Sequence, residues 1–136
     1  MAAKAVTATW LARAMVFRGD VEGKAPITID GESAEGPSPM DALLLALAGC
    51  TGSDVVDILR KKRLALRKLR IEVKGARRDE NPRRYTAIDL VYHVSAAGAT
   101  DQHVRQAIDL SLAKYCSVTH SLNPDIPIRY ELVLQA

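Results

Sequence analysis

The sequence predicts an α+β fold, because two kinds of apolar pattern follow one another along the chain. Segments in which apolar and polar residues alternate, as in half-buried strands, flank two segments with the apolar spacing of helices. Their order is strands, helix, two strands, helix and strand, and neither a repeat nor a linker interrupts it. We therefore expect a single domain over residues 1–136. Apolar residues make up 48% of the chain and aromatic residues only 4%, so aliphatic side chains must fill the core.

The N-terminal third is predicted to form strands. Apolar residues alternate over 6–10, and a second alternating stretch follows at 13–17. Arg18-Gly19-Asp20 has the composition of a turn, and residues 26–30 are predicted to form a short strand. The polar residues 32–36 are expected to be a loop.

The first helix has a strong start signal. Ser38 is suited to cap it, Pro39 to take its first position, and Asp41 completes a capping-box-like pattern. Almost every residue from 40 to 48 is apolar, so we expect this central helix to be buried on all sides. The basic run 60–63 suits its C-terminal end, and at ~1.5 Å per residue the helix would be about 36 Å long.

The second half of the chain is predicted to form two strands, a helix and a last strand. The strands alternate around residues 69–74 and 88–94, and the last strand around 128–134. The helix begins near Thr100 and is expected to continue to Cys116. Its predicted inward stripe consists of Val104, Ile108, Leu112, Tyr115 and Cys116.

Composition excludes several classes of function. The net charge is only +3, and the basic clusters lack interleaved aromatic residues, so we expect no nucleic-acid partner. The longest apolar run, 42–48, is far shorter than the ~20 residues that cross a bilayer, so no membrane association is expected. The N-terminus lacks the apolar block of a signal peptide. We therefore expect a cytoplasmic protein, in which any disulfide would be transient.

The chain has two cysteines, and both lie in predicted helices. If the helices pack together, Cys50 and Cys116 lie close to each other in a mostly dry place. A pair of neighbouring thiols is the minimum that thiol redox chemistry requires. A buried, inert thiol is an equally open interpretation for each, because free cysteine is among the most buried residue types. On its helix Cys50 shares a face with Leu43, Leu47 and Asp54, the candidate substrate pocket.

A reactive Cys50 requires a positive charge nearby. Asp54, one helical turn away, disfavours the thiolate, so a cation must come from elsewhere in the fold. Arg18 is the candidate and Arg13 the fallback, although an ordinary turn arginine is the alternative interpretation of Arg18.

A metal site is the competing use of the cysteines. Cys116 and His120 have the spacing C-x₃-H, which supplies two ligands. No second ligand pair completes a tetrahedral site, so we expect no metal. No phosphate-binding loop or other cofactor motif is present, and we expect no cofactor.

Four segments closely resemble the OsmC/Ohr family, named after osmotically inducible protein C and the organic hydroperoxide resistance proteins. They are Gly-Pro-Ser-Pro-Met-Asp at 36–41, Leu-Ala-Leu-Ala-Gly-Cys-Thr at 45–51, Asp-Val-Val-Asp-Ile-Leu at 54–59 and Lys-Tyr-Cys-Ser-Val at 114–118. The resemblance implies an intertwined α+β homodimer whose two active sites use residues of both chains. It implies that Cys50 is the peroxidatic thiol, that Cys116 resolves its sulfenic acid into a disulfide, and that Arg18 activates thiol and peroxide.

One position departs from the hydroperoxide-resistance branch. That branch has a glutamate directly after the proline that opens the helix, where it holds the arginine. Here the position is Met40, and the nearest acid, Asp41, is turned about 100° around the helix. In the residues of these motifs the chain resembles a less characterised OsmC-like branch.

The sequence thus predicts an enzyme of oxidative-stress defence, a thiol peroxidase that reduces organic hydroperoxides. The apolar residues Leu43, Leu44 and Leu47 would favour an alkyl peroxide, and an external dithiol would restore the enzyme. One alternative is a non-catalytic module that binds a small apolar or thiol ligand in the dimer groove. Another is a nucleic-acid partner that uses the arginine clusters and has steeply salt-dependent binding.

Overall fold

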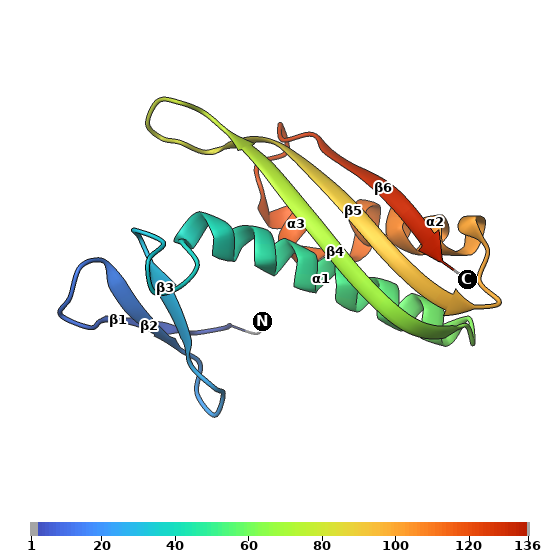
Figure 1. Ribbon diagram of the computed structural model, residues 1–136, viewed down its shortest axis with the longest axis horizontal. Coiled ribbons are helices and arrows are strands. Elements are labelled where there is room, and N and C mark those ends of the chain that lie inside the picture. Colours follow the sequence, from blue (N-terminus) through green and yellow to red (C-terminus); the bar gives the residue numbers. More distant parts are fainter. Residues whose placement is uncertain (1–2, 136) are drawn as a thin grey trace. The chain divides into compact units, whose positions relative to one another are not determined.

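The computed structural model describes residues 3–135 and confirms the α+β class (Figure 1). The chain falls into two compact units, an N-terminal unit up to Leu43 and a C-terminal unit from Leu44 onward. Each unit has its own three-stranded sheet. The long helix α1 (Pro39–Lys61) begins in the first and continues into the second.

The sheet of the N-terminal unit is antiparallel, in the order β1-β2-β3. Its strands are β1 (Thr7–Trp10), β2 (Val16–Asp20) and β3 (Ile27–Asp30). The prediction of a turn at Arg18-Gly19-Asp20 is wrong, because these residues belong to the central strand. Arg18 pairs with Thr9 on one side and with Thr28 on the other. A glycine signals a turn only where its neighbours do not find partners on adjacent strands.

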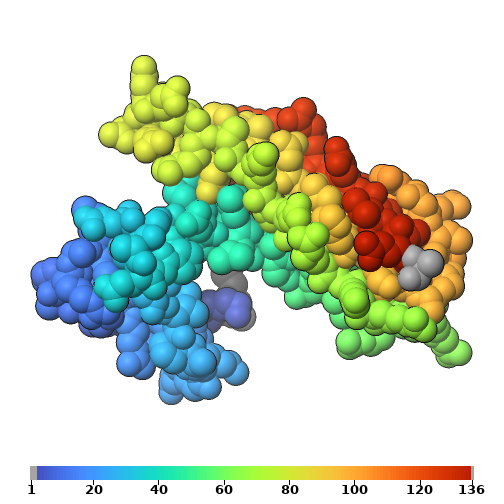
Figure 2. Space-filling view, in the orientation of Figure 1, coloured from blue at the N-terminus to red at the C-terminus, as the bar shows by residue number. Residues whose placement is uncertain are grey.

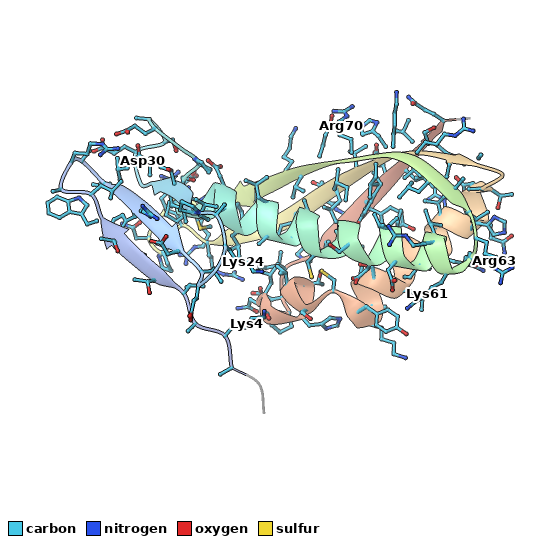
Figure 3. All side chains as sticks on the ribbon, turned by 90° about the horizontal axis from the view of Figure 1, so that it is seen from below. Lys4, Lys24, Asp30, Lys61, Arg63 and Arg70 are labelled. Carbon is cyan, nitrogen blue, oxygen red and sulfur yellow. The ribbon has the colours of Figure 1, made fainter. Side chains whose placement is uncertain are left out.

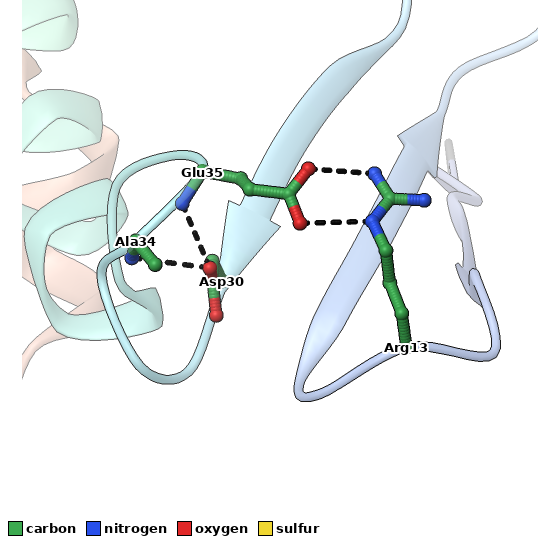
Figure 4. Close-up of polar contacts among 4 residues, drawn as sticks. All are labelled: Arg13, Asp30, Ala34 and Glu35. Atoms are coloured by element: carbon green, nitrogen blue, oxygen red, sulfur yellow. Dashed lines mark hydrogen bonds and ion pairs between the residues drawn. The ribbon is translucent and has the colours of Figure 1, made fainter.

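The loop after β3 is organised around the carboxylate of Asp30, which is almost completely buried (1% exposed). It accepts hydrogen bonds from the backbone N–H groups of Glu32, Ala34 and Glu35, at 2.9–3.1 Å. Figure 4 shows the bonds from Ala34 and Glu35, together with the bidentate ion pair between Glu35 and Arg13. These backbone bonds lower the pKa of Asp30, because they favour its charged form.

Replacing Asp30 with asparagine is expected to destabilise the protein at neutral pH. The folded-state pKa of Asp30 is lowered, so its contribution to stability is present above the unfolded pKa of about 3.9 and disappears as pH falls through the folded value. Thermal unfolding across pH 2–7 should therefore show a gap between wild type and Asp30→Asn that closes in acid. The exposed neighbour change Glu32→Gln is the control. A gap that is constant with pH would contradict the assignment.

Helix α1 begins with the predicted capping box. The Ser38 hydroxyl accepts the N–H of Asp41 at 3.0 Å, and the Asp41 carboxylate accepts the N–H of Ser38 at 3.0 Å. At the other end Arg63 has φ 59°, the left-handed conformation that closes many helices. There the N–H of Leu64 donates to the carbonyl of Leu59 at 3.0 Å. Lys61 and Arg63 point outward at this end (Figure 3).

The sheet of the C-terminal unit has the order β4-β5-β6. Its strands are β4 (Ala65–Arg77), β5 (Tyr85–Ala97) and β6 (Ile128–Gln135). β4 and β5 are antiparallel, whereas β5 and β6 are parallel and are joined by a helical crossover. The three strands form one continuous surface in the space-filling view (Figure 2). Arg70 projects from this outer face, away from α1 (Figure 3).

The core of the C-terminal unit lies between the inner face of this sheet and its helices. Strand β5 is its centre, and its alternation is as predicted: the residues that point inward are buried, namely Ile88, Leu90, Tyr92 and Val94. Helix α1 packs closely on β4 at Gly52, where an added Cβ would lie 3.1 Å from the Ile71 side chain. A Cβ at Gly52 would require the Ile71 side chain to move by a few tenths of an ångström.

The prediction that α1 is buried on all sides is wrong for the single chain. One stripe is buried: Leu47, Thr51, Gly52, Val55 and Leu59. On another face Leu45 is 62% exposed, and Ala46 and Gly49 are also exposed. By length and composition alone α1 would suit a membrane span, and only part of this apolarity is explained by its buried stripe.

The second helical region is broken into three pieces, α2 (Asp101–Leu110), the π-helical turn η1 (Ser111–Tyr115) and α3 (Ser117–Ser121). Thr100 caps α2, which agrees with the predicted start. Val104 and Ile108 are buried as predicted, but Tyr115 is 50% exposed. Ser111 continues the inward stripe of Val104 and Ile108, and Cys116 is buried as predicted. The wider π turn moves Tyr115 off that stripe.

Candidate active site

The two cysteines meet inside the C-terminal unit, although α1 supplies one and the segment after η1 the other. The Cys50 and Cys116 thiols are close enough to interact. Their exposure differs, because Cys50 is partly exposed whereas Cys116 is completely buried. A reagent from solvent therefore reaches Cys50 first.

Cys116 is held by its own backbone and by the helix that follows it. Its N–H donates to the carbonyl of Ser111 at 2.7 Å, which closes the π turn. Its sulfur accepts the N–H of Thr119 at 3.5 Å, as the N-cap of α3. The Thr119 hydroxyl also lies near the sulfur, and it is a buried group without a hydrogen-bond partner among residues 3–135. Cys116 therefore has a defined position and orientation.

Burial raises the pKa of the Cys116 thiol above its usual value. The two groups of Thr119 lower this pKa, and the neighbouring Cys50 raises it further, so the net direction is upward. Cys116 is therefore a protonated thiol at neutral pH. It is suited to react second, with a sulfur already oxidised by an external reagent.

The raised pKa of Cys116 predicts a loss of stability in mild alkali. Its cost appears once pH exceeds the unfolded thiol pKa of about 8.5, because the unfolded chain then loses a proton that the folded chain keeps. Chemical denaturation at pH 7 and pH 9.5 should show a decrease in unfolding free energy that is smaller in Cys116→Ser. An equal decrease in both proteins would contradict the assignment.

A chain of buried hydroxyl groups lies beside the two thiols. Thr51 Oγ1 is 2.8 Å from the hydroxyl oxygen of Tyr92 and 2.7 Å from Ser111 Oγ. Ser111 in turn donates to Asp54 Oδ2 at 2.8 Å. Since each hydroxyl has one hydrogen, Thr51 donates to Ser111 and Tyr92 donates to Thr51. All three hydroxyl-bearing residues are completely buried, and burial raises the pKa of Tyr92 well above its usual range.

Sequence reasoning missed three members of this chain: Thr51, Tyr92 and Ser111. Thr51 directly follows Cys50, and its position in the apolar part of the helix is a usable signal, since a buried hydroxyl needs a partner. Tyr92 lies on the inward side of a predicted strand, and Ser111 lies three and seven positions after Ile108 and Val104, so both carry the same signal. That the three hydroxyls meet depends on packing between separate segments, which the sequence pattern does not indicate.

Comparison with known proteins shows to which family this chain belongs. The family model described as OsmC-like protein matches residues 31–131. The chain belongs to the OsmC/Ohr family. It is 38% identical to Protein YhfA of Escherichia coli strain K12 over 122 residues, which are 88% of this chain and 91% of YhfA.

Solved structures agree with the OsmC/Ohr assignment. A hypothetical protein from Aquifex aeolicus VF5 is similar with a TM-score of 0.85 and 30% identity, over 100% of both chains. The organic hydroperoxide resistance protein OhrB of Bacillus subtilis has a TM-score of 0.62 and 14% identity, over 96% of this chain and 97% of OhrB. At that identity the likeness to OhrB shows the fold.

The two candidate arginines of this OsmC-like protein lie in the N-terminal unit, and both have acidic partners. Arg18 donates to both carboxylate oxygens of Asp20, at 3.0 and 3.2 Å. Its side chain is 55% exposed. Arg13 is bound to Glu35 as described above. Asp20 and Glu35 thus hold the two guanidinium groups in this chain, in which Met40 follows the proline that opens α1. The activating role of Arg18 stays a prediction.

The predicted apolar pocket of the OsmC-like chain is only partly available. Leu47 is 1% exposed, so its side chain belongs to the core, whereas Leu43 is half-buried. Asp54 accepts its hydrogen bond from Ser111 and also lines a groove of about 520 Å³, together with Leu110 and Tyr115. It therefore connects the hydroxyl chain to the surface.

No metal cluster occurs in the OsmC-like chain among residues 3–135, where no three His, Cys, Asp or Glu side chains gather. Of the C-x₃-H pair, Cys116 is buried and His120 is exposed. The two side chains therefore differ in access to an ion from solvent.

Proposed function

We propose that this OsmC-like protein is a thiol-dependent peroxidase that reduces organic hydroperoxides, with Cys50 as the attacking thiol. The observation that carries the proposal is the asymmetry of the thiol pair. Cys50 is partly exposed, whereas the adjacent Cys116 is buried and its pKa is raised. In that arrangement the Cys50 thiol is accessible to the peroxide, and the Cys116 thiol can then react with the oxidised Cys50. The name of OhrB adds support at the level of the family.

The oxidative reaction has two balanced steps. The Cys50 thiolate attacks the distal oxygen of the peroxide, the O–O bond breaks, and the leaving alkoxide takes up a proton to become an alcohol. Cys50 is then a sulfenic acid. The Cys116 thiol attacks its sulfur, an S–S bond forms, and the hydroxyl group leaves with the Cys116 proton as water.

The reductive reaction needs an external dithiol. Because Cys116 is buried, the dithiol reaches the Cys50 sulfur, forms a mixed disulfide there and releases Cys116. The N–H of Thr119 stabilises the departing Cys116 sulfur. The second thiol of the reductant then displaces Cys50 and leaves as a cyclic disulfide.

Arg18 is proposed to favour the Cys50 thiolate and the charge on the leaving oxygen. Its support is its position in the N-terminal strand region, as the family resemblance implies. Arg18 is held by Asp20 in the single chain, so this role requires the guanidinium to be presented to a thiol in the assembled protein.

The same proposal includes a homodimer. Its support is the exposed apolar face of α1 around Leu45, which water would otherwise contact. Light scattering should give twice the chain mass of 14.8 kDa, and Leu45→Lys should shift the protein toward the monomer. A monomer at micromolar concentration would contradict a dimer.

Intact-mass analysis tests the proposed activity. One equivalent of cumene hydroperoxide should remove about two mass units from the reduced wild type, since a disulfide loses two hydrogens. Cys116→Ser should instead retain a sulfenic acid that reacts with dimedone. An unchanged mass in the wild type would contradict the peroxidase and would favour the non-catalytic binding module.

A further inference from the structure

We infer that Thr51 and Ser111 are positioning residues, which hold the Cys116 segment in register with Cys50 so that the sulfenic acid is captured as a disulfide before it is oxidised further. The inference deepens the proposed function and rests on it for the peroxide reaction. The step concerned is the second one, in which Cys50 and Cys116 form a disulfide.

Ser111 connects the two segments that carry the thiols. Its carbonyl accepts the N–H of Cys116 at 2.7 Å, so it lies directly beside the resolving cysteine. Its hydroxyl contacts Thr51 at 2.7 Å and Asp54 at 2.8 Å, both on α1. Thr51 follows Cys50 directly, and Asp54 lies one helical turn beyond Cys50. Displacement of Ser111 would therefore change the position of one thiol relative to the other.

The bonds of this chain are mutually dependent. Thr51, Ser111 and Tyr92 are each completely buried, so none of them can replace a lost partner with water. Each hydroxyl donates in one direction, toward Asp54, and the chain has no alternative arrangement that satisfies every member. Such a network favours one arrangement of α1 against η1.

The chemistry makes that arrangement important. A disulfide requires an S–S distance of about 2.05 Å and a narrow range of dihedral angles. A displacement of ~1 Å in a reacting group can slow a step by about 10²-fold. When disulfide formation is slow, further peroxide oxidises the sulfenic acid to the irreversible sulfinic acid. The ratio of sulfinic acid to disulfide therefore reports the register of the two thiols.

The test compares Thr51→Val, which removes the hydroxyl at nearly constant volume, with Thr51→Ser, which keeps it. Ser53→Ala is the matched control on α1, because the exposed Ser53 hydroxyl donates only to the carbonyl of Gly49 among the described residues. Disulfide formation is measured with cumene hydroperoxide and, independently of peroxide chemistry, with the thiol oxidant diamide. Intact mass gives the sulfinic-to-disulfide ratio, and thermal unfolding shows that each variant is folded.

Thr51→Val should slow disulfide formation about 10- to 100-fold with both oxidants and should raise the sulfinic-to-disulfide ratio. Thr51→Ser should recover most of both values, and Ser53→Ala should match the wild type. If Thr51→Val does not fold, Ser111→Ala replaces it with the same expectation. A wild-type rate and ratio in the hydroxyl-free variant would overturn the inference, as would an equal loss in Thr51→Ser.

The two oxidants separate this inference from the proposed function. If wild type forms the disulfide with diamide but does not react with peroxide, the peroxidase proposal fails. The diamide comparison of Thr51→Val with Thr51→Ser then still decides the positioning role. If wild type forms no disulfide with either oxidant, the inference is overturned as well.

Discussion

Cys50→Ser is expected to lose peroxide consumption by about three orders of magnitude or more, because a serine hydroxyl is a far weaker nucleophile than a thiolate. The loss should appear in the steady-state rate with cumene hydroperoxide and a dithiol reductant. Folding should be unaffected, since Cys50 is only partly buried and serine is smaller than cysteine. Thermal unfolding of the variant checks this point.

The matched comparison is Cys116→Ser, which keeps the attacking thiol and removes the resolving one. Without a reductant it should consume a first equivalent of peroxide at close to the wild-type rate and form a sulfenic acid. It should then consume further peroxide only slowly, as the uncaptured sulfenic acid is oxidised to sulfinic acid. Full turnover by Cys50→Ser would contradict the assignment of the attacking thiol. A complete loss of the first equivalent in Cys116→Ser would show that the roles of the two cysteines are not divided as proposed.

Leu59→Ala is expected to give the largest loss of stability, about 2–5 kcal/mol in the free energy of unfolding. Leu59 is 0% exposed, and it lies on the buried stripe of α1 two turns beyond Thr51. Removing its side chain leaves a cavity in the core of the C-terminal unit. Urea denaturation at pH 7 measures the effect.

Leu110→Ala is the control for that experiment. Leu110 is 43% exposed at the end of α2, so its truncation should change the unfolding free energy by about 0.5 kcal/mol or less. Equal losses in the two variants would show that burial in a single chain does not govern stability here. The peroxide rate of Leu59→Ala, measured well below its midpoint, separates a loss of fold from a loss of chemistry.

Much of the fold could be predicted because its signals are local. The capping box needs only Ser38 and Asp41, three positions apart, and it forms as expected. The alternation in β5 also depends on one segment, and its inward residues are buried. The prediction for residues 18–20 failed because strand pairing with β1 and β3 is a contact between separate segments. The exposed face of α1 was also not predicted. An apolar pattern indicates that a helix face is buried, but it does not indicate which segment or chain covers that face.

By itself, the sequence determined the α+β order, the start of α1 and the presence of a thiol on each of two helical segments. Tertiary structure alone decided how those thiols are arranged. It placed Cys50 at a partly exposed position, buried Cys116 behind a π turn, and linked Thr51 to Tyr92 and Ser111. The physical reason is that these bonds join residues 41 and 60 positions apart, which meet only when sheet and helices have packed.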